Sequence, residues 1–134
     1  MGKNAKVTFH GIFCQTADDA GSNIEVFGKV YARTQSQTNV LWDVQDGDGV
    51  NIAPQSVYLP GQPKTTITVH DNEALFLGAR LFEEDDFEND KFDGREKRVE
   101  LFDINSAEKY FPVPLVEVDG GSRIRVDFTV VEDH

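Results

Sequence analysis

The chain has 134 residues and a formal net charge of −11, with 13 basic residues scattered among 24 acidic ones. This length is typical of one domain with one core, so we expect a single domain over residues 1–134. Neutralising a phosphate backbone requires clustered lysine and arginine, and the composition therefore argues against a nucleic-acid partner. Direct attraction to an anionic membrane is disfavoured for the same reason.

Alternation of apolar and polar residues runs through the chain, and no convincing helical stripe is present. The clearest alternation is in 122–131, where the apolar residues are Ile124, Val126, Phe128 and Val130. Strands are expected at 6–14, 24–34, 39–45, 64–70, 74–82, 96–103 and 122–131. The short pieces 57–59 and 111–115 lie beside or contain prolines, which predicts edge strands or irregular links.

Turn residues rich in glycine, asparagine, aspartate and proline separate these segments. We therefore predict an all-β fold, an antiparallel two-sheet β-sandwich of about eight strands, with no helix longer than about three turns. The run 74–79 is apolar on both faces, which predicts a central strand with both Phe76 and Leu77 buried. The turn Asp46-Gly47-Asp48-Gly49 is a hairpin signal, because its spacing does not fit an EF-hand calcium loop.

Motifs for catalysis are missing from the sequence. It has no nucleophile elbow, phosphate-binding glycine loop or paired-histidine zinc motif, so we expect a non-catalytic protein. The single cysteine, Cys14, lies in an apolar stretch and is expected to be a buried thiol. No apolar run reaches the ~20 residues of a membrane helix, and no signal peptide follows Met1. We expect a soluble protein that is cytoplasmic or has already lost its leader.

The segment 83–94 is the most unusual in the chain, with seven carboxylates in twelve residues between two predicted strands. Such a concentration of anions is repulsive unless solvent screens it or a cation binds. Calcium takes six to eight oxygen ligands, and this segment can supply several of them. The alternative is a solvated hairpin tip that discourages aggregation.

These features resemble a C2 domain, a calcium-dependent β-sandwich. In the later acidic loop the pattern is Leu81-Phe82, Glu83-Glu84-Asp85, Asp90, Phe92 and Gly94, and in the earlier loop it is Asp19-Ala20-Gly21-Ser22-Asn23 before a strand. Two positions depart from the family, since Glu83 and Asn23 stand where it has Asp. The family's basic strand patch for phosphoinositides has no clear counterpart.

The resemblance implies a calcium site made by the two loops, with Asp19, Asn23, Glu83, Asp85 and Asp90 as ligands. It also implies that calcium allows the acidic tip to engage a phospholipid headgroup or a protein partner. The apolar residues in the later loop, Phe87 and Phe92, would then contact that partner, and packing beneath the loop is the alternative for both.

A second interpretation is a β-sandwich module for protein or carbohydrate recognition without functional calcium. Exposed aromatic side chains would then gather on a sheet face, from Phe27, Tyr31, Trp42 and Tyr58. Either interpretation leaves the ligand and the oligomeric state open.

Overall fold

A computed structural model of the protein describes residues 2–17, 22–84 and 89–134. Within these ranges it is built from antiparallel β-strands and one short 3₁₀ turn, η1 (Leu101–Asp103). The strands are β1 (Lys3–Thr16), β2 (Ile24–Arg33), β3 (Thr38–Val44), β4 (Val50–Ile52), β5 (Val57–Tyr58), β6 (Lys64–Val69), β7 (Leu75–Glu83), β8 (Asp90–Asp93), β9 (Lys97–Val99), β10 (Lys109–Glu117) and β11 (Arg123–Glu132).

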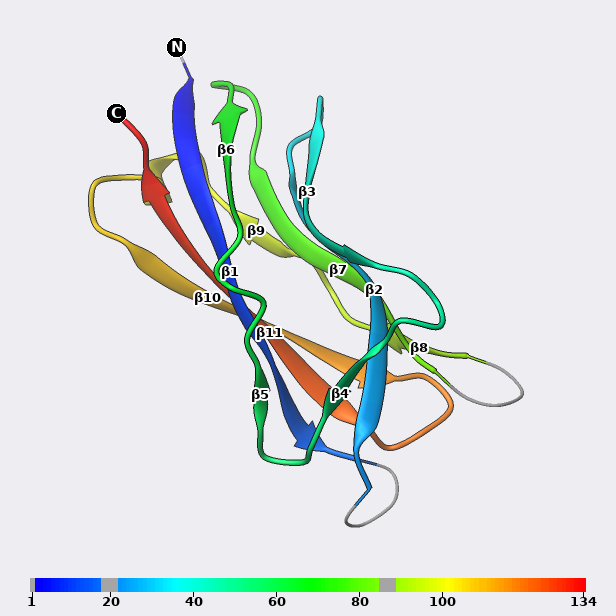
Figure 1. The fold of residues 1–134 in the computed structure, drawn as a ribbon. Helices are drawn as coiled ribbons and strands as arrows, with labels where there is room; N and C mark the ends of the chain where they lie inside the picture. The colour runs from blue at the N-terminus through cyan, green and yellow to red at the C-terminus, as the bar shows by residue number, and fades with distance from the viewer. Residues whose placement is uncertain (1, 18–21, 85–88) are drawn as a thin grey trace.

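Two layers face each other in this structure (Figure 1). One layer, here called the β2–β7 sheet, has the order β3-β2-β7, with β4 paired to β2 and β9 paired to β7. The other, the β1–β11 sheet, has the order β10-β11-β1, with β5 and β6 both paired to β1. The predicted antiparallel β-sandwich is therefore confirmed. β4 and β8 are short strands that the sequence did not predict, and the strand expected at 96–103 is shorter, with β9 at Lys97–Val99 followed by η1.

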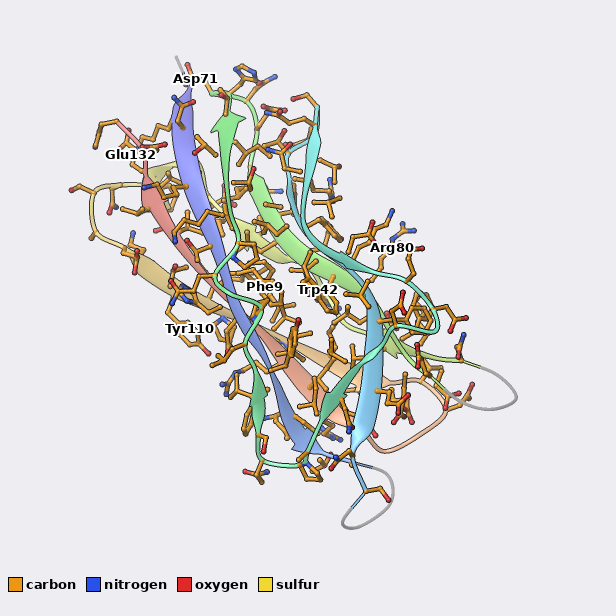
Figure 2. All side chains as sticks on the ribbon, viewed as in Figure 1. Phe9, Trp42, Asp71, Arg80, Tyr110 and Glu132 are labelled. Atoms are coloured by element: carbon orange, nitrogen blue, oxygen red, sulfur yellow. The ribbon has the colours of Figure 1, made fainter. Side chains whose placement is uncertain are left out.

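The core lies between the two sheets, and Phe9 makes one aromatic contact across them and one with its neighbour in the same sheet. Phe9 on β1 meets the ring of Trp42 on β3 edge to face at 6.1 Å and that of Phe128 on β11 at 6.2 Å. Figure 2 labels Phe9 and Trp42 in the middle of the molecule. Cys14 is also fully buried, as expected, and burial followed by the nearby Glu83 charge raises the pKa of its thiol.

The expectation for β7 was half right. Leu77 is fully buried, but Phe76 is only half-buried, so the prediction for Phe76 was wrong. Its ring lies on the outer face of the sheet, where the guanidinium of Arg33 stacks at 4.4 Å and that of Arg98 at 5.6 Å. The apolar outer side of β7 is thus covered by two arginine side chains instead of another layer.

The expectation for the proline-containing segment also needs correction. It was predicted as a short edge piece, yet β10 has nine residues and pairs with β11 from Lys109 to Val116. Its other edge pairs with β8 only at Val116 and Glu117. Pro112 and Pro114 therefore lie where one edge of β10 has no partner strand among the described residues, and there a missing N–H is tolerated.

The full burial of Leu77 gives a stability test. Leu77→Ala should lower the free energy of unfolding by about 2–5 kcal/mol, because it leaves a cavity in a closed core. Val118, which is 58% exposed, is the control, and Val118→Ala should change stability by less than about 0.5 kcal/mol. Urea unfolding followed by tryptophan fluorescence measures both, and equal losses would contradict the assigned core.

Candidate functional site

The strand ends that flank the two acidic loops lie at the same end of the sandwich. The antiparallel register of β2 and β7 places Val26 opposite Glu83, so the start of β2 lies beside the end of β7. Residues 18–21 precede the former and residues 85–88 follow the latter. Three of the predicted site residues, Asp19, Asp85 and Phe87, fall in these two segments and lie outside the described residues.

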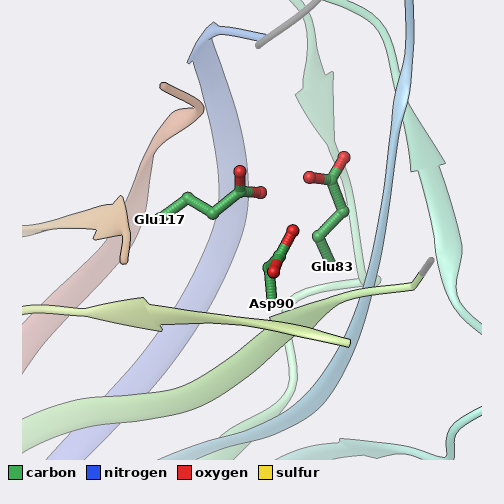
Figure 3. Close-up of side chains that lie close together, drawn as sticks. All are labelled: Glu83, Asp90 and Glu117. Carbon is green, nitrogen blue, oxygen red and sulfur yellow. The ribbon is translucent and has the colours of Figure 1, made fainter. Parts of the chain in front are cut away.

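Three carboxylates meet at this end. Glu83 on β7, Asp90 on β8 and Glu117 on β10 each offer an oxygen, and these oxygens lie within 4.8 Å of one another (Figure 3). Glu83 and Asp90 are direct cross-strand partners. We call this group the carboxylate cluster.

The backbone explains why Glu117 joins the other two. Strand β8 pairs with β7 along one edge and with β10 along the other, where Phe92 is opposite Glu117. A further hydrogen bond, from the Val118 amide to the Lys91 carbonyl at 2.9 Å, continues the β10 contact. A short strand shared by both sheets therefore brings three strand ends together.

All three carboxylates occupy inward-facing positions. Side chains alternate along a strand, so Glu117 falls on the same side as the buried Val113 and Leu115. By the same alternation, Glu83 follows Leu81 and Asp90 precedes Phe92 on the core side. Glu117 is 1% exposed, whereas Glu83 and Asp90 are half-buried. The carboxylate cluster therefore lies at one end of the space between the two sheets.

The three carboxylates repel one another when all of them are ionised. Two unit charges 4.8 Å apart repel by about 3 kcal/mol at an effective dielectric constant of about 20. Burial of Glu117 adds a desolvation cost for its charged form. A divalent cation held between the three carboxylates would replace repulsion with attraction, and carboxylate oxygens are the ligands that calcium prefers.

A further carboxylate, Glu84, binds the turn at 46–49 to this end of the sandwich. Its Oε1 accepts hydrogen bonds from the backbone amides of Gly47 at 2.6 Å and Gly49 at 2.9 Å. The Gly49 bond is the main reason that the pKa of Glu84 is below its usual value, and the Gly47 bond lowers it further. The Asn89 side-chain amide also donates to Asp46 at 2.8 Å. The turn at 46–49 is therefore fixed against both strands that flank residues 85–88. It is not the predicted hairpin, because β3 and β4, which it joins, both pair with β2 and not with each other in the described residues.

The remaining predicted residues lie as follows. Glu83 and Asp90 belong to the carboxylate cluster, and Asn23 is exposed just before β2, outside the cluster. Phe92 is 2% exposed and part of the core, which favours the alternative of packing beneath the loop over contact with a partner. Sequence reasoning missed Glu117, although the alternation Val113, Leu115, Glu117 already assigned it to the core side.

Comparison with solved structures supports the fold. The chain is similar to the C2 domain designated A of plant extended synaptotagmin 1, with a TM-score of 0.58 and 12% sequence identity, over 98% of this chain and 94% of that one. At this identity the likeness shows the fold alone, and the chain has a C2-like fold. Sequence comparison found no matching family model and no matching curated protein.

In residues 2–17, 22–84 and 89–134, no helix is both long and apolar enough to cross a bilayer.

The lowered pKa of Glu84 predicts a pH effect at this end. A carboxyl group with a depressed folded-state pKa stabilises the fold above its unfolded pKa, and this contribution is lost as the pH falls through the folded pKa. Glu84→Gln should therefore lower the melting temperature at neutral pH and have less effect at acidic pH. Carbon-detected NMR titration of the Glu84 carboxyl should give a pKa below that of free glutamate, and an ordinary value would contradict the two amide bonds.

Proposed function

We propose that this chain is a non-catalytic C2-like binding module that holds a divalent cation, calcium by its ligand chemistry, at the carboxylate cluster. The supporting observation is that three carboxylates, one of them almost fully buried, lie within 4.8 Å of one another at the end of the sandwich. Ionised carboxylates this close repel one another, whereas a cation between them would use the same oxygens as the anionic ligands that calcium prefers.

In this proposal Glu83, Asp90 and Glu117 form the inner wall of the site. Calcium takes six to eight oxygens, so these carboxylates leave ligand positions open even when some bind through both oxygens. Asp19 and Asp85 are the sequence candidates to complete the shell, because their segments adjoin β2 and β7 at this end. Asn23, with a neutral amide oxygen, is a weaker candidate.

The function of the cation would be electrostatic. A chain with a net charge of −11 repels anionic lipid headgroups and acidic protein surfaces. A calcium ion at the carboxylate cluster would offset two of its three negative charges, and its open ligand positions would be available to the partner. The C2-like fold supports this class of binding module, and Phe87 is the apolar side chain proposed to contact the partner.

Thermal unfolding with and without calcium tests the cation. A ligand that binds only the folded state stabilises it by ~2.7 kcal/mol at one hundred times its dissociation constant. The melting temperature should rise with calcium chloride and rise much less with sodium chloride of equal ionic strength. Glu117→Gln should abolish most of the calcium response, and without calcium it should melt no lower than the wild type, because repulsion is relieved.

Asp71→Asn is the matched control, since Asp71 lies on an exposed turn at the opposite end of the molecule (Figure 2). It should keep the full calcium response. Equal effects of calcium and sodium, or a normal calcium response in Glu117→Gln, would refute the proposed site.

Co-sedimentation with lipid vesicles tests the partner. Vesicles of phosphatidylserine and phosphatidylcholine should retain the protein in calcium and release it in chelator, and Phe87→Ala should weaken retention. If calcium raises the melting temperature but the vesicles do not retain the protein, the proposed partner is a protein and not a lipid.

A further inference from the structure

The outer face of the β2–β7 sheet carries a groove of about 880 Å³. Its floor comes from the outward residues of β2 and β7, and β3 with the following turn forms one wall. The exposed lining residue Arg80, labelled in Figure 2, is next to the buried Leu81 on β7, and the lining residue Phe27 is next to the buried Val26 on β2, so the lining residues point away from the core. The groove is therefore on the opposite side of this sheet from the core and does not include the carboxylate cluster.

An aromatic platform and a pair of cations form the floor. The rings of Phe27 and Phe82 stack across the two strands, with centroids 5.3 Å apart and planes inclined by 19°, and both side chains remain partly exposed. The next outward pair along the same strands is Lys29 opposite Arg80, both exposed. Apolar ring surface thus adjoins strong hydrogen-bond donors.

One end of the groove is held rigid by a hydrogen-bond network. Tyr31 donates to Oε2 of Glu96 at 2.5 Å, and Arg33 donates to both oxygens of the same carboxylate at 2.7 and 2.6 Å. The Tyr31 ring lies over Gly78, where a Cβ would be only 2.6 Å from the tyrosine oxygen. Burial, then the bond to Glu96, raises the pKa of Tyr31 to about 12, so it remains a donor. A preorganised wall of this kind lowers the cost of binding.

The charges that line the groove balance. The lining residues include three cations and three carboxylates, namely Lys29, Arg33, Arg80, Asp43, Asp46 and Glu96. Their sum is zero, in a chain whose net charge is −11. A polyanion would meet as much repulsion as attraction here. A neutral ligand rich in hydroxyl groups would find donors, acceptors and an aromatic surface together.

We propose that this groove binds a neutral oligosaccharide. The apolar C–H face of a sugar ring would pack on Phe27 and Phe82, while its hydroxyl groups would donate to Asp43 and accept from Lys29 and Arg80. This ligand satisfies both kinds of polar group at once, which an anionic ligand does not. The binding is independent of the proposed cation and is expected in the presence of chelator.

Two-dimensional amide NMR in chelator tests the proposal, with cellohexaose, maltohexaose and mannohexaose as separate probes at millimolar concentration and inositol hexakisphosphate as the anionic probe. At least one hexasaccharide should shift amide signals concentrated in β2, β3 and β7. Phe27→Ala should weaken its apparent affinity by about tenfold, the scale of one aromatic contact. Asp43→Asn should also weaken it, because a charged acceptor is lost.

Tyr110→Ala is the matched control, since Tyr110 is a 54% exposed aromatic residue on the other sheet, where its hydroxyl binds Asp127. It should leave sugar binding unchanged, and all variants should melt cooperatively. The proposal is overturned if none of the three sugars shifts these strands, or if Phe27→Ala binds as the wild type does. It is also overturned if only inositol hexakisphosphate binds and Asp43→Asn strengthens it, which would identify an anion site.

Discussion

Strand β8 pairs along both edges, with β7 at Glu83 and Asp90 and with β10 at Phe92 and Glu117. This double pairing joins the two sheets at one end and determines where the neighbouring ends of β7 and β10 lie. It buries the ring of Phe92 between the layers and, through alternation, turns Asp90 inward as well. The same pairing brings the end of β10 close to β7. The four-residue strand β8 therefore both helps to close the core and assembles the carboxylate cluster.

The carboxylate cluster is an exception to the rule that inward-facing residues are apolar. Such exceptions occur more often at functional sites than elsewhere in a protein. Around it the backbone is held firmly: Glu84 binds two amides of the 46–49 turn, and Asn89 binds Asp46. The 46–49 turn is thereby fixed against the end of β7 and the start of β8, which also carry Glu83 and Asp90. This rigidity is what a cation site needs, because ligands that are already in place cost less to order on binding.

Much of the fold could be predicted from the sequence: alternation predicted the sandwich, the run 74–79 predicted the burial of Leu77, and the Asp-Gly pairs predicted a turn at 46–49, although not its position between two strands that both pair with β2. The misses have physical causes. Phe76 looked like a core residue because sequence patterns do not reveal that arginine side chains can cover a ring from the outside. Glu117 was missed because Pro112 and Pro114 made 111–115 look irregular, and no local signal indicates which distant carboxylates a strand end will meet. Phe27 and Tyr31 do share an outer face, whereas Trp42 and Tyr58 pack against the core and bond to each other.

The central claim is that Glu83, Asp90 and Glu117 together hold one divalent cation, and a crystal structure grown with calcium tests it most directly. Long-wavelength anomalous diffraction distinguishes calcium from water and sodium. The account predicts one strong anomalous peak about 2.3–2.6 Å from an oxygen of each of the three carboxylates. Crystals saturated with calcium that show no peak there, while the three side chains keep their positions, would contradict it.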